Sequence, residues 1–148
     1  MRFISDLLLR YLFAVIAIAL YGTLIFTSGL DAVIPRIAMT TFHTGSVMLF
    51  VLVVYVPVCW LMFSIISVWY KPVWLELGLS LLIPLMAYVV LPAVYKYVYP
   101  DNYNDWGAGS MDQLSDRREL MRFIDYLGST VTVVLIALFM QMFRSRKK

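Results

Sequence analysis

The chain has 148 residues, of which 62% are hydrophobic and 14% charged, and its formal net charge is +3. Soluble domains average about 45–50% apolar residues, and the mean hydropathy here is +0.83, so the composition excludes an ordinary soluble domain. No patch of Lys and Arg interleaved with aromatic residues forms a nucleic-acid groove in the sequence. We therefore predict an all-α integral membrane protein in which residues 1–148 form a single domain.

Four long apolar stretches are the predicted transmembrane helices, because each approaches the roughly 20 residues that a spanning helix needs. In chain order they cover residues 7–26, 45–69, 74–95 and 123–143. The first is longer than the roughly 7–15-residue apolar core of a signal peptide, so we expect an uncleaved span. The short connection between the second and third stretches predicts an antiparallel hairpin.

Lys and Arg near the span ends predict which side of the membrane each end occupies. The side with both termini holds seven of the 12 Lys and Arg residues, and the other side holds seven of the nine acids. The basic run from Arg144 to Lys148 is the clearest anchor. We predict a four-helix bundle with both termini cytoplasmic (N-in/C-in) and, for so small a chain, a bacterial inner (plasma) membrane.

Residues 96–122 form the only long polar segment, on the side opposite the termini. Residues 99–109 are rich in turn-forming residues. Ser110 and Gln113 fit a helix-capping box, and neither Pro nor Gly follows before Gly128. We therefore expect a helical outer extension that continues into the fourth span. The acidic and aromatic residues of this segment that a partner could contact are Asp101, Tyr103, Asp105, Trp106, Asp116 and Glu119.

A stripe of polar and proline residues runs along the third span at every fourth position: Glu76, Ser80, Pro84, Tyr88 and Pro92. Residues four apart lie on one side of a helix. Each proline frees a backbone carbonyl, which in lipid needs a partner or a cavity. Two interpretations follow. The kinked helix lines a polar crevice with Glu76 at its cytoplasmic mouth. Alternatively, as we favour, it is a kinked packing helix whose freed carbonyls are satisfied by the Ser80 hydroxyl and neighbouring spans, with Glu76 close enough to the interface to reach water.

The start of the fourth span combines an acid with small residues. Asp125 lies just inside the predicted interface, where an acid needs a partner, so we predict a structural ion pair, with Arg122 or Arg118 as the cation, rather than a proton relay. Gly128 and Thr132, four residues apart, predict close packing of another helix, within one subunit or between subunits. In the second span, Pro57 should kink the helix by removing the hydrogen bond to Val53.

Cys59 and His43 are each the only residue of their kind. A single cysteine excludes an internal disulfide or a CxxC pair, and in an apolar run without basic neighbours it is expected to pack as a small hydrophobe. His43 has no other metal-ligating residue nearby in the sequence. A solvated interfacial side chain is therefore expected, with pH sensing as an alternative because histidine titrates near neutrality. No metal or cofactor site is predicted.

The sequence holds no Gly-rich phosphate loop, nucleophile elbow or HExxH motif. It favours a small non-enzymatic membrane subunit that senses or docks a cytosolic or envelope protein, as a homo-oligomer in the lipid bilayer. A bacterial envelope sensor, an antiphage defence component and an immunity protein fit this description. An oligomeric pore lined by Ser80 and Tyr88 is the alternative. A lipid-modifying enzyme that uses the charged residues 112–125 is a third class.

Overall fold

The computed structural model describes residues 2–27, 37–69, 71–98 and 111–146. It describes the side chains of these residues except those at positions 2–3, 37–42, 91–92, 95–96 and 111–121. The described residues are almost entirely helical and contain no strand, which confirms the all-helical expectation. Four of their helices are long and apolar enough to cross a membrane: Ile4–Thr27, His43–Ile66, Pro72–Val90 and Arg122–Ser145.

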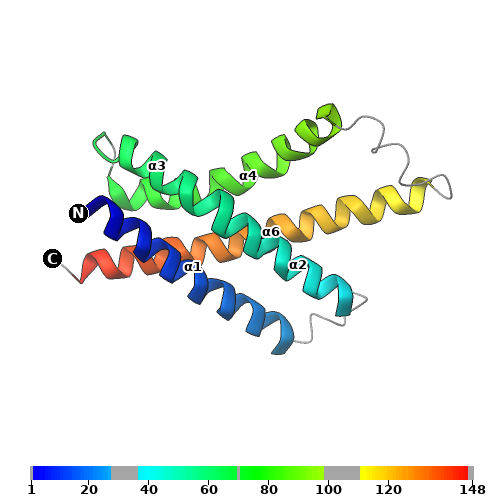
Figure 1. Cartoon of the computed structure of the whole chain (residues 1–148), viewed down its shortest axis with the longest axis horizontal. Coiled ribbons are helices and arrows are strands. Elements are labelled where there is room, and N and C mark those ends of the chain that lie inside the picture. Colours follow the sequence, from blue (N-terminus) through cyan, green and yellow to red (C-terminus); the bar gives the residue numbers. More distant parts are fainter. Residues whose placement is uncertain (1, 28–36, 70, 99–110, 147–148) are drawn as a thin grey trace.

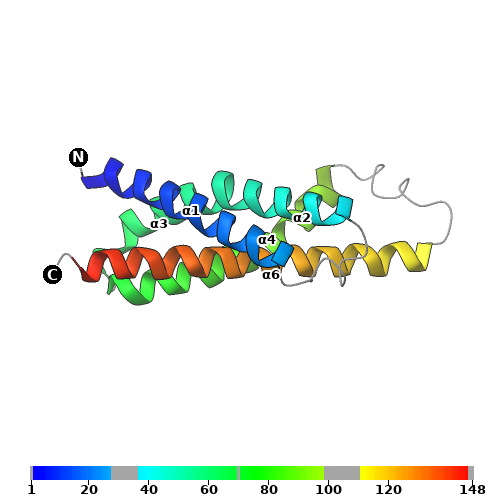
Figure 2. The same cartoon turned by 90° about the horizontal axis from the view of Figure 1, so that it is seen from below.

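The helices form two layers that lie against each other (Figure 2). Near the termini, one layer contains α1 and the other contains α4 and α6, and the continuous α2, η2 and α3 lie with α1. Toward the opposite end, α1 crosses to the level of α6 and α4 crosses to the level of α2. The two termini and the turn from α3 to α4 lie at the same end of the molecule, which we call the termini end (Figure 1). The bounds are α1 Arg2–Thr27, α2 Ile37–Leu49, η2 Phe50–Tyr55, α3 Val56–Ile66, α4 Pro72–Val98 and α6 Met111–Ser145.

The second span changes its helical pitch in the middle. Residues Phe50–Tyr55 form a π-helical segment, in which the N–H of Val56 bonds the carbonyl of Val51, five residues earlier. Pro57 follows at the start of α3. Because proline cannot donate an N–H and its ring crowds the preceding turn, a local π adjustment keeps the neighbouring backbone groups bonded inside a membrane. The disturbance expected at Pro57 is therefore a widened turn directly before it.

The longest helix, α6, runs without interruption from Met111 to Ser145 over 35 residues. This confirms the predicted continuity between the polar segment and the fourth span. At 1.5 Å per residue the helix is about 52 Å long, whereas the hydrocarbon core of a bilayer is about 30 Å thick. One end of α6 therefore extends beyond any membrane that the bundle spans.

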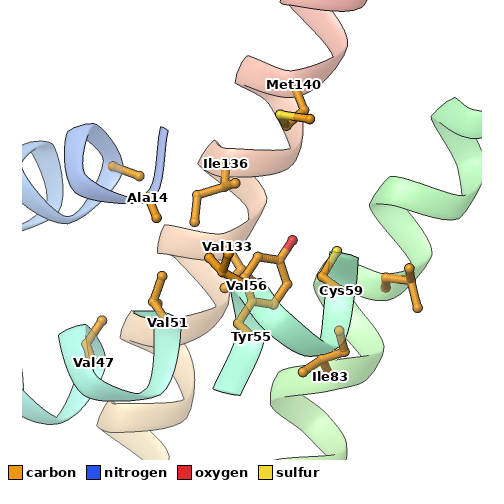
Figure 3. Close-up of a cluster of buried hydrophobic side chains, with 12 residues drawn as sticks. Ala14, Val47, Val51, Tyr55, Val56, Cys59, Ile83, Val133, Ile136 and Met140 are labelled. Atoms are coloured by element: carbon orange, nitrogen blue, oxygen red, sulfur yellow. The ribbon is translucent and has the colours of Figure 1, made fainter. Parts of the chain in front are cut away.

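A layer of mainly apolar side chains fills the middle of the bundle. Val133, Ile136 and Met140 of α6 face the side chains of the other helices (Figure 3). Ala14 and Ala17 of α1 are fully buried, and small residues at these positions let α1 approach α6 closely. The remaining members of this layer are Val47, Val51, Tyr55, Val56, Cys59, Leu79 and Ile83.

The helix α4 leaves the bundle along its length. It starts beside α6 at the termini end, and its later half turns away from α6 (Figures 1 and 2). Pro84 is buried in the middle of the helix, and proline is the usual cause of a bend in a long helix. Beyond it, apolar side chains such as Val89 and Val94 are 60% and 50% exposed, so in a bilayer they face lipid.

Candidate functional site: two buried polar clusters

A cluster of four charged side chains lies at the termini end of the bundle, and we call it the ion cluster: Asp6, Arg10, Glu76 and Arg144. Arg10 of α1 donates to both carboxylate oxygens of Glu76 in α4, with its Nη2 at 3.0 Å from Oε2. Its Nε also donates to Asp6 Oδ2 at 2.9 Å, one turn earlier in α1. Two parallel bonds to one carboxylate fix the plane of the guanidinium.

Arg144 closes the ion cluster from the last turn of α6. Its Nη1 lies 2.9 Å from Glu76 Oε2, and its Nη2 lies 3.0 Å from Asp6 Oδ1. Both arginines also stack over the ring of Phe63 in α3, with Cζ atoms 4.9 Å and 4.2 Å from the ring centroid. The cluster thus contains two guanidinium and two carboxylate groups, has no net charge and contacts all four spans.

The ion cluster is deeply buried on one side and open on the other. Arg10 is 1% exposed and Glu76 is 0% exposed, whereas Asp6 and Arg144 retain 25% and 29% exposed side chains. The expectation that Glu76 reaches water is wrong. One turn each of α1, α4 and α6 packs together around Glu76. Its carboxylate therefore bonds Arg10 and Arg144 instead of solvent.

The rest of the polar stripe on α4 is divided. Ser80 and Pro84 are buried with Glu76, and the Ser80 hydroxyl donates to the carbonyl of Leu77 in its own helix at 2.7 Å. Tyr88 is 37% exposed, and its ring lies 5.1 Å from that of Tyr126 in α6. The side chain of Pro92 lies outside the described residues. The stripe therefore serves helix packing in its first half and reaches the surface at Tyr88.

Cys59 touches the ion cluster, contrary to the expectation that it packs without basic neighbours. Its Sγ lies 3.2 Å from Arg10 Nη1 and 3.8 Å from Glu76 Oε1. Tyr55, one turn earlier, lies beside it (Figure 3). The Tyr55 hydroxyl is buried, and it has no hydrogen-bond partner among the described residues. The Cys59 sulfur and the Tyr55 hydroxyl thus place polar atoms between the ion cluster and the apolar layer.

A second cluster, which we call the histidine cluster, lies nearer the opposite end: Tyr21, His43, Ser46 and Asp125. His43 Nδ1 lies 2.5 Å from Asp125 Oδ1, and His43 Nε2 lies 2.7 Å from the Tyr21 hydroxyl. Ser46 donates to the other carboxylate oxygen of Asp125 at 3.3 Å. A hydrogen-bonded chain thus joins α6, α2 and α1.

Two predictions about this cluster are wrong. His43 is not a solvated interfacial side chain, because it is 1% exposed. Asp125 is not paired with Arg122: among the ion pairs of the described residues it is paired with His43. The physical reason is helix packing, which brings α2 against the inward face of α6, where Asp125 lies with a side chain that is one-third exposed.

Gly128 makes the close approach in the histidine cluster possible. A Cβ atom at this position would lie 2.3 Å from the Tyr21 hydroxyl oxygen and 2.9 Å from two atoms of the His43 ring. Thr132 is fully buried one turn further on, and its hydroxyl donates to the Gly128 carbonyl at 2.8 Å. The packing predicted for these two residues therefore occurs within the chain, against α1 and α2.

The predicted partner-facing residues are described only in part. Asp101, Tyr103, Asp105 and Trp106 lie outside the described residues. The backbone at Asp116 and Glu119 belongs to α6, while their side chains are outside the described set.

Arg10 is one of the seven Lys and Arg residues counted on the side of the termini, and its pairing with Asp6 and Glu76 was not predicted from the sequence. The available signal was its position inside the first apolar stretch, four residues after Asp6, where a charge is costly unless it is paired.

Chemically, the histidine cluster can hold a proton along a chain of three side chains, and the ion cluster can hold four spans in register. In the described part of the chain, no group of three or more His, Cys, Asp and Glu residues is arranged to bind a metal ion. Compared with known proteins, the chain matches no family model, no curated protein and no solved structure.

Proposed function

We propose that this chain is a non-enzymatic membrane subunit that senses or docks a partner protein, that it works as a homo-oligomer, and that α6 transmits the binding event. The main support is the continuity of α6. A single helix connects the charged residues 111–121 to Asp125 of the histidine cluster and to Arg144 of the ion cluster. The segment 111–121 adds about 16 Å of helix at 1.5 Å per residue.

A rigid helix that is held at two levels couples its ends. A partner that tilts or shifts the segment 111–121 moves Asp125 against His43 and Arg144 against Glu76, because no loop in α6 absorbs the motion. Coupling between distant sites has a physical basis where both sites bias an element with two arrangements. In this proposal α6 is that element. Asp125 links it to His43 of α2 and Arg144 links it to Asp6 of α1, and these directional hydrogen bonds would rearrange as α6 moves.

The distribution of Lys and Arg supports cytoplasmic termini. With that orientation the segment 111–121 lies on the outer side of the membrane, away from the cytoplasm. A bacterial inner membrane subunit with this orientation would meet envelope proteins or invading particles, which suits a role in envelope sensing, antiphage defence or immunity. A cytosolic partner would instead meet the termini end.

The pore is less well supported. Between the two polar clusters the buried residues of the described bundle include Ala17, Val51, Val133 and Ile136. Ion-conducting paths are typically built from rings of carbonyl groups or charged side chains. The described residues buried at this level are mainly apolar, with Thr132 and the Tyr55 hydroxyl as polar exceptions. Tyr88 lies on the outer surface, so a pore that it lines would have to form between chains.

An enzyme would have its most plausible acid–base pair in His43 and Asp125, since a carboxylate that orients a histidine is common in general-base catalysis. The second ring nitrogen of His43 is bonded to Tyr21, however, and the ring is 1% exposed. A substrate atom cannot reach that nitrogen unless Tyr21 moves. The arrangement therefore favours a structural or switching role over turnover.

The test is purification of a tagged chain from its own host in mild detergent, with its mass measured by light scattering and co-purifying proteins identified by mass spectrometry. We expect a discrete homo-oligomer with a defined second protein. The double substitution Asp116→Asn with Glu119→Gln should remove the second protein without changing the oligomer mass. The matched control is Val68→Lys with Trp69→Lys, which makes the same +2 change in net charge at two residues of the termini end that are each 83% exposed.

A monomer without a second protein would contradict the proposal. So would equal loss of the partner in the control, because the interaction would then depend on net charge rather than on the α6 extension.

A further inference from the structure

A shallow apolar groove lies between α1 and α6 at the termini end, and its volume is about 200 Å³. Its lining is Phe13, Phe139, Met142, Phe143 and Arg146. The Phe13 ring contacts both other rings, at centroid distances of 5.7 Å from Phe139 and 6.1 Å from Phe143. Met142 and Phe143 are 55% and 36% exposed, so the groove opens sideways toward the space that lipid occupies in a bilayer.

The guanidinium of Arg146 lies at one end of this groove. Arg144 and Arg146 are two residues apart in sequence, which corresponds to roughly 200° around a helix. Arg144 turns inward to Glu76 and Asp6, so Arg146 points to the other side. Arg146 is exposed, and no ion pair among the described residues includes it. The sequence continues with Lys147 and Lys148.

We propose that this groove binds one anionic phospholipid, with an acyl chain against Phe13, Phe139 and Phe143 and the headgroup phosphate on Arg146. Charge complementarity selects this occupant. Arg146 lies just beyond the level of the ion cluster, at the helix end, where long basic side chains reach the headgroup region. Basic pockets between spanning helices on one side of a membrane are suited to anionic headgroups. The site is independent of the function proposed for the α6 extension.

The experiment uses the full chain, purified in detergent and depleted of lipid, in native mass spectrometry. Equimolar phosphatidylglycerol and phosphatidylcholine with identical acyl chains are added. We expect one phosphatidylglycerol per chain at several-fold higher occupancy than phosphatidylcholine. Arg146→Gln should lower phosphatidylglycerol occupancy to the phosphatidylcholine level. Lys71→Gln, which removes an exposed cation at the same end, should leave it unchanged.

A second variant tests the groove itself. Met142→Trp replaces an exposed lining residue with a larger one, and we expect it to lower the occupancy of both lipids by a similar factor. Three results would overturn the proposal. They are equal retention of the two lipids by the unmodified chain, equal effects of Arg146→Gln and Lys71→Gln, and a chain dimer that Met142→Trp dissociates while no lipid is retained.

Discussion

His43 and Asp125 lie 82 positions apart in the chain, and their side chains meet at 2.5 Å between Nδ1 and Oδ1. This contact joins the start of the second span to the start of the fourth. His43 uses its other ring nitrogen to bond Tyr21, so the ring makes a hydrogen bond to a different helix on each side. The imidazole links three helices because its two nitrogens point in different directions.

The pairing of His43 with Asp125 predicts a measurable energetic coupling. In a double-mutant cycle of His43→Phe and Asp125→Asn, we expect the two destabilisations not to add, with a coupling free energy of about 0.5–3 kcal/mol. The measurement is reversible unfolding in mixed detergent micelles. The matched cycle of Arg122→Gln with Asp125→Asn should give additive effects, and strong coupling there would show that Arg122 is the true partner.

Gly128 and Gly78 should respond to alanine in opposite directions. Gly128→Ala should lower the unfolding free energy by about 1–3 kcal/mol, because the new Cβ overlaps Tyr21 and His43 and forces them to move. At Gly78 no atom lies within 4 Å of an added Cβ, so Gly78→Ala should raise stability by about 0.5–1 kcal/mol through helix propensity. Thermal unfolding followed by circular dichroism measures both. A Gly128→Ala variant that is as stable as the unmodified chain would contradict the packing at Gly128.

Replacing one charged partner of the ion cluster should lower the free energy of unfolding far more than replacing two partners that bond each other. Arg10→Met leaves the buried Glu76 with Arg144 alone, and we expect a loss of about 3–5 kcal/mol, as for other broken buried ion pairs. Adding Glu76→Leu should restore much of that loss, since Asp6 and Arg144 remain bonded to each other. Unfolding in mixed micelles measures the difference. A double variant that is less stable than Arg10→Met would refute this account.

Cys59 should act as a reporter of unfolding. It is fully buried beside Arg10 and Glu76, and it is the only cysteine of the chain. A maleimide should label the folded protein in detergent many-fold more slowly than the protein in denaturing detergent. The rate is followed by mass shift, and a variant with a new cysteine at the exposed position Trp69 is the control for reagent access. If the folded protein were labelled equally fast at Cys59 and at the cysteine introduced at position 69, Cys59 would not be buried.

The spanning helices could be predicted because their signal is local. A run of apolar residues such as 123–143 needs no knowledge of the rest of the chain, and the absence of Pro and Gly before Gly128 was enough to extend α6 back to Met111. Pairings are different. Arg10 and Glu76 are 66 positions apart, and nothing in either local sequence indicates that their helices meet at that level.

His43 and Asp125 show why the sites were harder to predict than the spans. The sequence suggested that Asp125 needed a partner, which is correct, but the nearest cation in sequence was Arg122. The structure uses a residue from another helix because Asp125 lies on the packed side of α6, while Gly128, one turn later, leaves space for the His43 ring. Which face of a helix is packed depends on its neighbours, and a single sequence does not contain that information directly.

The ion cluster joins residues that are far apart in the order of synthesis. Asp6 and Arg10 of α1 are synthesised before Glu76 of α4, and Arg144 of α6 follows. Before Arg144 arrives, the membrane-embedded group contains two carboxylates and only one guanidinium, so its charge is unbalanced in a medium that tolerates charge poorly. The balance is reached only when α6 joins the bundle and brings Arg144 to Glu76 and Asp6. A bundle without the end of α6 would therefore keep an uncompensated carboxylate between α1 and α4.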